Sequence, residues 1–282
     1  MDRLDTPGAM SQWARSHEPH GVIGLVPTMG FLHEGHASLM RRLRPLCDRL
    51  VVSIYVNPLQ FGPNEDLERY PRDPEGDWAL CASEGVDAVF LPTDLYPDGF
   101  ASQVAVHGLT DGLCGAGRPG HFEGVTTVCA RLFGLTRCRV ATFGEKDFQQ
   151  LMVLRRMVED LALPVQIVPS PLVRDADGVA LSSRNKYLSP TQRERARTLH
   201  RTLQALSAEV EQGSRDVASL LQSAVQRIDS DRVEYLEVVD ARSLKPLTTI
   251  GEAPARALVA AHYGSTRLID NVAVGTPLSW DA

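Results

Sequence analysis

Apolar residues in the first 170 positions fall into short runs, separated by longer stretches with a helical spacing. The runs contain many valine and isoleucine residues and do not alternate with polar ones, which is typical of strands buried on both faces of a parallel sheet. Between them, apolar residues recur at steps of three and four, as from Phe148 to Leu161, and predict amphipathic helices. This alternation predicts a doubly wound α/β domain. The predicted strands cover residues 22–26, 50–56, 88–91, 138–143 and 165–168.

The second half of the chain begins with signals for two helices. Ser189 is followed by Pro190, and Gln192 stands three positions after the serine, so this segment predicts a helix start with a capping box. The helix is expected to end near Gly213, and Ser214 is expected to cap the next one.

Three strand-like runs, "VEYLEVVD", "ALVAAHY" and "TRLIDNVAV", follow these helices with turn residues between them. Consecutive strands at this spacing predict a small antiparallel sheet. The change of pattern lies near residues 174–178, so we predict an α/β domain over residues 1–175 and a smaller α+β domain over residues 176–282.

Composition narrows the class of protein. With a net charge of −6 and a pI near 5.8, the chain is a poor candidate for a general nucleic-acid binder. No apolar run approaches the ~20 residues of a membrane span, and the first residues lack the pattern of a signal peptide. The odd number of cysteines and the absence of C-x-x-C argue against a disulfide scaffold or zinc knuckle. We therefore expect a cytoplasmic protein with free thiols at Cys47, Cys81, Cys114, Cys129 and Cys138.

The stretch "PTMGFLHEGHASLMRRL" holds the first candidate site, because a predicted strand ends at Val26 and a helix is expected to begin near His36. Ligands bind at the carboxyl ends of strands in open parallel sheets, and a helix N-terminus there attracts phosphate. His33 and His36 are three residues apart and can share one helix face, while Gly35 allows a close approach to the backbone. Two imidazoles at this place can donate hydrogen bonds to charge that develops on phosphorus. Ordinary structural histidines are the alternative, and zinc is disfavoured because metalloprotease histidines are spaced i, i+4.

Two further stretches follow predicted strands in the same way. In "RVATFGEKDFQQLMVL", Lys146 at a helix start suits a phosphate, Gln150 can face the same cleft, and Asp147 could instead simply cap the helix. In "VNPLQFGPNEDLERYPR", Asn57 and Gln60 offer donors and acceptors that suit a polyol or an amide, although an ordinary loop would contain them too.

A fourth stretch, "ALSSRNKYL", places two hydroxyl groups, an arginine and Lys186 at the predicted domain boundary. Such a loop can close over a polyphosphate, although the motif alone is weak.

Five motifs in this order carry a resemblance over nearly the full length: "PTMGFLHEGH", "VNPLQFGPNEDLERYPR", "GRPGHFEGVTTV", "FGEKDFQQL" and "VRDADGVALSSRNKYL". Together they resemble the pantothenate synthetase family, whereas the H-x-G-H motif alone marks only the wider nucleotidyltransferase-like superfamily. The resemblance implies ATP- and Mg²⁺-dependent joining of pantoate to β-alanine through a pantoyl adenylate, with release of AMP and pyrophosphate. It also implies a Rossmann-like first domain, a second domain that acts as a lid, and a homodimer.

The resemblance assigns roles by motif. It implies catalysis by His36, with His33, Lys146, Ser182, Ser183 and Arg184 beside it. It implies pantoate binding by Gln60 and Gln150, to which we add Asn57 and Met29. The residues implied to contact ATP are Pro27, Thr28, Met29, Gly30, Phe31, Leu32, His33, Glu34, Gly35, His36, Gly144, Glu145, Lys146, Asp147, Val173, Leu181, Ser182, Ser183 and Arg184.

The sequence departs from the family pattern at two places. Leu181 stands where relatives commonly have methionine, a nearly volume-conserving change. Gly76 interrupts an acidic run, so a metal role for Asp77 is in doubt and the protein ligands of Mg²⁺ are not predicted. Two rival functions stay open: a nucleotidyltransferase that leaves the nucleotide on its product, and a nucleotide-binding regulator without turnover.

Overall fold

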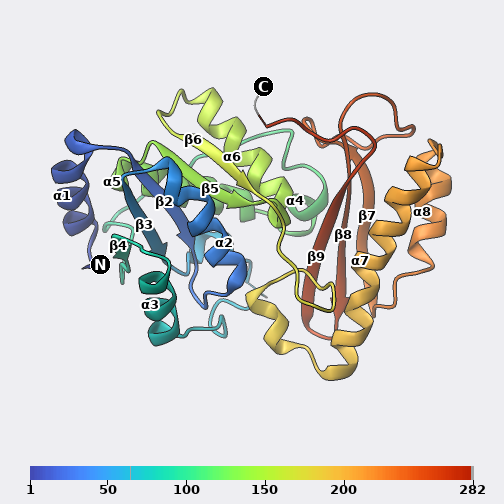
Figure 1. Ribbon diagram of the computed structural model, residues 1–282, viewed down its shortest axis with the longest axis horizontal. Helices are drawn as coiled ribbons and strands as arrows, with labels where there is room; N and C mark the ends of the chain where they lie inside the picture. The colour runs from blue at the N-terminus through green and yellow to red at the C-terminus, as the bar shows by residue number, and fades with distance from the viewer. Residues whose placement is uncertain (64, 281–282) are drawn as a thin grey trace. The chain divides into compact units, whose positions relative to one another are not determined.

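Six parallel strands form the first sheet of the protein, in the order β1-β4-β3-β2-β5-β6. Figure 1 labels β2 to β6 of this sheet. The computed structural model describes residues 1–63 and 65–280. The strands are β1 (Asp2–Leu4), β2 (Ile23–Thr28), β3 (Arg49–Ile54), β4 (Ala88–Phe90), β5 (Val140–Gly144) and β6 (Gln166–Ser170). The predicted parallel α/β sheet is thus confirmed, with strand ends shifted by one or two residues. The unpredicted β1 is three residues long and mostly polar, and it pairs along β4 at the sheet edge.

The chain divides into two compact units. The first comprises Met1–His107, Arg118–Glu145 and Gln150–Pro171. The second comprises Gly108–Gly117, Lys146–Gln149 and Leu172 onward. Two short segments from the first half of the sequence therefore belong to the second unit, which the apolar pattern does not reveal; the functional division at residue 175 stays a prediction.

Both faces of the parallel sheet are buried. On one face, strand residues such as Val26 and Val52 pack with Met40 of α2 and Cys81 of α3. Neighbouring positions that point the other way are equally buried, as Leu25 shows with no exposed surface. The helices are α1 (Pro7–His17), α2 (Glu34–Leu43), α3 (Pro74–Ser83), α5 (His121–Thr136) and α6 (Phe148–Asp160), with 3₁₀ turns η1 (Glu18–His20), η2 (Arg44–Leu46), η3 (Pro58–Gln60) and η4 (Glu145–Asp147).

The second unit is built on an antiparallel sheet of β7 (Arg232–Asp240), β8 (Ala255–Tyr263) and β9 (Thr266–Val274), as the sequence predicts. Two helices, α7 (Pro190–Glu211) and α8 (Val217–Val225), pack against it around one apolar core. The unit also contains α4 (Leu113–Gly117) and η5 (Ser183–Tyr187).

The helix caps confirm one prediction and correct another. Ser189 and Gln192 form the predicted capping box at the start of α7. The start of α8 is capped by Asp216, not by Ser214. The carbonyl of Arg215 accepts a 2.9 Å hydrogen bond from the amide of Ile250, and the extended Asp216 forms an antiparallel bridge with Thr249, so the helix begins two residues later than predicted.

The five cysteines are free thiols, as predicted. Within the described residues, no helix has both the length and the apolar character that crossing a membrane requires.

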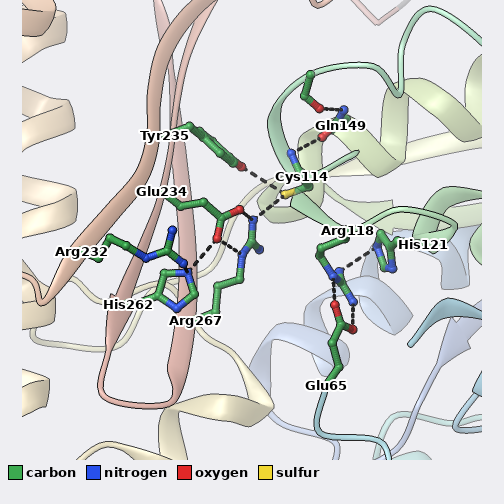
Figure 2. Close-up of polar contacts among 11 residues, drawn as sticks. Glu65, Cys114, Arg118, His121, Gln149, Arg232, Glu234, Tyr235, His262 and Arg267 are labelled. Atoms are coloured by element: carbon green, nitrogen blue, oxygen red, sulfur yellow. Dashed lines mark hydrogen bonds and ion pairs between the residues drawn. The ribbon is translucent and has the colours of Figure 1, made fainter. Parts of the chain in front are cut away.

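A charged cluster lies at one end of the antiparallel sheet (Figure 2). Glu234 accepts two hydrogen bonds of 2.9 Å from Arg267 and lies 2.7 Å from Nε2 of His262. Arg267 also donates to the Cys114 sulfur at 3.4 Å, and the Tyr235 hydroxyl lies 3.1 Å from the same atom. The Arg267 hydrogen bonds lower the pKa of Glu234 to about 2.

This lowered pKa predicts acid sensitivity of the second unit. The carboxylate of Glu234 stabilises the fold fully above its usual pKa of 4.5, and this contribution is lost as the pH falls toward 2. We expect Glu234→Gln to lower the melting temperature at pH 7. Between pH 4.5 and about 2, the melting temperature of this variant should depend less on pH than that of the unsubstituted protein. Melting curves across the range measure this, and parallel curves for both proteins would contradict it.

Candidate active site

The turn between β2 and α2 is fixed at both of its ends. Thr28, at the end of β2, donates from its hydroxyl to the carbonyl of Ser53 on β3 at 2.8 Å, and it accepts from the amide of Gly30 at 3.3 Å. Gly30 and Phe31 both have positive φ angles, of 86° and 53°. At the other end of the turn, α2 begins at Glu34, two residues earlier than predicted, with His33 as its N-cap.

His33 and His36 form the capping box of α2 themselves. Nδ1 of His33 accepts a hydrogen bond from the amide of Gly35 at 3.1 Å, and Nδ1 of His36 accepts one from the amide of His33 at 3.2 Å. The ring centroids are 4.1 Å apart. In most capping boxes, a serine or threonine and a glutamate or glutamine supply these two acceptors. Here two histidines take their places.

The capping bonds determine where each ring carries its proton. Because Nδ1 of His33 and Nδ1 of His36 both accept, the proton of each neutral ring lies on Nε2. The amides of His36 and Ala37 donate to the carbonyl of His33. Several of the amides at this end of α2 are therefore hydrogen-bonded within the protein, while the positive end of the helix dipole remains a general attraction for an anion.

The side chain of Gln60 contacts the β2–α2 turn at Met29 and is held by Asn57. Its Nε2 lies 3.2 Å from the sulfur of Met29, and its Oε1 accepts from Nδ2 of Asn57 at 3.0 Å. Asn57 is almost fully buried and bonds Gly124 and Tyr96 as well. The structure therefore brings Met29, Asn57 and Gln60 together at the carboxyl edge of the sheet, with Asn57 placed to orient Gln60.

A second network holds the backbone of Gln60. Figure 2 shows its three side chains, which belong to Glu65, Arg118 and His121. Nδ1 of His121 lies 2.9 Å from the Gln60 carbonyl, and Nε2 of the same ring lies 2.9 Å from Arg118. Since Arg118 donates to Nε2, Nδ1–H donates to the carbonyl. Arg118 also binds Glu65 through two bonds of 2.6 Å. Burial of Glu65 opposes its ionisation, but the arginine nevertheless lowers its pKa.

The backbone of α5 approaches η3 so closely that only glycine fits at position 124. A Cβ there would lie 2.3 Å from the carbonyl oxygen of Leu59. Sequence reasoning assigned no role to Gly124, Arg118 or His121, although all three lie in the motif "GRPGHFEGVTTV".

In the segment after β5, the two adjacent glutamines Gln149 and Gln150 differ in burial. Gln149 is buried, accepts from the amide of Cys114 at 2.9 Å and donates to two carbonyls, so it is structural. Gln150, the predicted ligand, is partly exposed. The backbone carbonyl of Lys146 accepts a hydrogen bond from Nδ2 of Asn271 at 3.0 Å. The side-chain amino group of Lys146 lies 3.5 Å from Oδ2 of Asp147.

In the second unit, the predicted nucleotide residues cluster around a short hairpin. The amide of Leu181 donates to the carbonyl of Val173 at 3.0 Å, which places these two residues side by side. Ser182 caps η5 by accepting from the amide of Arg184 at 3.3 Å, and Ser183 is buried. Arg174 anchors the hairpin through two bonds of 2.7 and 2.8 Å to Asp270 of β9.

The part of the chain that the structure describes contains no group of three or more His, Cys, Asp or Glu residues arranged to hold a metal ion. Mg²⁺ commonly keeps several waters and binds through substrate phosphates instead of a protein cage.

A parallel sheet buried on both faces, with an H-x-G-H motif at the carboxyl end of a central strand, defines an α/β protein of the nucleotidyltransferase-like class. The family model for pantoate-beta-alanine ligase matches residues 3–273. The chain therefore belongs to the pantoate–β-alanine ligase family, as its motifs predict.

Relatives and solved structures agree with this assignment. A pantothenate synthetase of Heliobacterium modesticaldum is 51% identical over 97% of this chain and 99% of its own length. One of Moorella thermoacetica is 50% identical over 96% and 98%. The crystal structure of pantothenate synthetase from Thermus thermophilus has a TM-score of 0.92 at 46% identity and covers 98% of this chain and 100% of its own. That of the Francisella tularensis ligase, complexed with β-γ ATP and β-alanine, has a TM-score of 0.79 at 32% identity, covering 96% and 97%.

The double role of His36 can be separated by two substitutions. Glutamine at this position keeps the acceptor of a capping box, so His36→Gln is expected to retain the melting temperature, whereas His36→Ala loses about 1 kcal/mol of stability. Both variants lose the ring Nε2–H donor, and kcat is expected to fall by about 10²–10³. Steady-state kinetics and melting curves test this; full turnover in His36→Gln would remove the ring from catalysis.

Proposed function

We propose that this chain condenses pantoate with β-alanine, uses ATP, and releases AMP and pyrophosphate through a bound pantoyl adenylate. The observation that carries the proposal is the pair of imidazoles that cap α2 with their protons on Nε2. Family membership over nearly the whole chain supports the choice of substrates.

The chemistry needs positioned donors more than a covalent nucleophile. The pantoate carboxylate attacks the α-phosphorus of ATP and pyrophosphate leaves, so negative charge grows on the non-bridging and leaving oxygens. His33 and His36 donate from Nε2 to this charge, and Lys146, Ser182, Ser183 and Arg184 supply further donors and charge to the phosphates. The amine of β-alanine then attacks the carbonyl of the mixed anhydride and AMP leaves, which requires water to be excluded.

Gln60 and Gln150 are assigned to pantoate, and Asn57 acts through Gln60. An amide can both donate and accept, which matches the hydroxyl and carboxyl oxygens of a hydroxy acid. The remaining motif residues around the β2–α2 turn, β5 and the hairpin of the second unit are assigned to ATP. Mg²⁺ bound to ATP, a homodimer, a lid role for the second domain and a cytoplasmic location complete the proposal, and these rest on the family resemblance.

Two adjacent glutamines offer a matched test of the pantoate site. Gln150→Ala is expected to weaken pantoate by about 1–3 kcal/mol while ATP binding changes little, because it leaves pantoate oxygens unpaired in a closed site. Gln149→Ala is expected instead to lower the melting temperature, because it removes three internal hydrogen bonds. Calorimetric titrations with both ligands measure this. Equal weakening of pantoate and ATP in Gln150→Ala would show that the assignment is wrong.

The order of the two steps predicts an exchange reaction. Adenylation needs only pantoate, ATP and Mg²⁺, so labelled pyrophosphate should exchange into ATP without β-alanine, and the exchange should fail without pantoate. Lys146→Ala should slow it sharply, because a charge directed at phosphate is lost. Exchange that appears only after β-alanine is added would contradict a stepwise mechanism.

AMP release tests the substrates themselves. AMP is expected only when pantoate, β-alanine and ATP are all present. A product that retains the nucleotide would favour the rival nucleotidyltransferase, and ATP binding without AMP under any acid and amine pair would favour the regulator.

A further inference from the structure

Asp77 of α3 places its carboxylate against the turn between β2 and α2. Oδ2 accepts from the amide of Phe31 at 3.0 Å, and Oδ1 accepts from the amide of Leu32 at 2.6 Å. The residue is 3% exposed. Both carboxylate oxygens therefore bind backbone groups that lie 46 and 45 positions earlier in the sequence.

The turn needs an acceptor at this place. Gly30 and Phe31 are consecutive residues with positive φ, a conformation that a phenylalanine rarely adopts. This backbone conformation directs the amides of Phe31 and Leu32 toward the buried carboxylate of Asp77. Without an acceptor, N–H groups that face away from water would cost free energy. The fit is also tight, since a Cβ on Gly30 would lie 3.0 Å from Oδ2 of Asp77.

The position of the turn determines the position of the histidines. One residue after Leu32, the extended backbone of His33 (φ −143°, ψ 178°) lets its ring fold back to the amide of Gly35. A turn that relaxed toward negative φ would change the direction in which the chain enters α2. The capping box and both Nε2–H donors would then move with it.

The same bonds argue against Asp77 as a metal ligand. A cation would have to compete with two amide groups for the two oxygens, and Gly76 supplies no second carboxylate beside it. Burial raises the pKa of Asp77, and the two backbone hydrogen bonds oppose this rise.

We infer that Asp77 is a positioning residue for adenylation: its carboxylate holds the turn at Gly30–Leu32 so that His33 and His36 face the reacting phosphate, and it does not bind Mg²⁺. The inference rests on the proposed function for the identity of the reaction.

Asp77→Asn keeps the size of the side chain but replaces one acceptor oxygen with a donor that faces an amide. The pyrophosphate exchange rate is expected to fall by about tenfold to hundredfold, the range for one hydrogen bond to a charged group. The Mg²⁺ concentration for half-maximal exchange is expected to stay unchanged. Asp73→Asn is the matched control, because Asp73 caps the same helix by accepting from the amide of Gly76 and asparagine caps equally well. It should keep the rate of the unsubstituted protein.

Two outcomes would overturn the inference: an Asp77→Asn protein with an unchanged rate, or one whose rate recovers at high Mg²⁺. If Asp77→Asn does not fold, Asp77→Glu replaces it. The longer carboxylate can still bind Mg²⁺ but displaces the turn, so positioning predicts a loss of rate and a metal role predicts its retention.

Amide hydrogen exchange gives a measurement that does not depend on activity. The amides of Phe31 and Leu32 are expected to be protected in the full-length protein and to exchange faster in Asp77→Asn. Rapid exchange of both in the unsubstituted protein would overturn the inference. If the protein releases no AMP from the three substrates while these amides behave as expected, the proposed function fails and the structural role of Asp77 stands.

Discussion

The turn from β2 to α2 passes through two left-handed residues, Gly30 and Phe31, and the buried carboxylate of Asp77 accepts hydrogen bonds from the amides of Phe31 and Leu32. In the first unit, the geometry of the candidate site depends on this constraint. The turn sets where His33 begins the helix, and the cap set by His33 in turn sets where His36 lies. A long-range side-chain contact thereby fixes a local backbone conformation, which fixes the positions of the two imidazole rings.

In the two histidines, one ring nitrogen, Nδ1, caps the helix, and the other, Nε2, carries the proton. A serine or glutamate cap would stabilise α2 as well, but it would carry no second ring nitrogen. An imidazole has two nitrogens in a rigid ring, so the Nδ1 that accepts from the backbone dictates a proton on Nε2. The helix start thus determines the tautomer of both rings.

The sequence pattern predicts what depends on near neighbours. The buried strands, the amphipathic helices, the antiparallel sheet and the capping box at Ser189 follow from spacing and composition. The hydrogen bond from Ile250 to Arg215 and the bridge between Asp216 and Thr249 displace the predicted cap from Ser214 to Asp216, because a contact between distant residues overrides a local preference. The roles of Asp77 and His121 have the same origin, since each binds backbone that lies tens of residues away and leaves no periodic signal.

Gln60 shows why such distant contacts matter for recognition. A free glutamine has three rotatable bonds, and ordering it when a ligand binds costs conformational entropy. Here Asn57 donates a hydrogen bond to the side-chain oxygen of Gln60, and His121 binds the backbone carbonyl of Gln60. Gly124 has no side chain, so the backbone of α5 can pack closely against η3. Much of that entropy is lost when the protein folds, before any ligand arrives. A side chain that is ordered before binding loses less conformational entropy when a ligand contacts it, so folding prepares Gln60 for its proposed role.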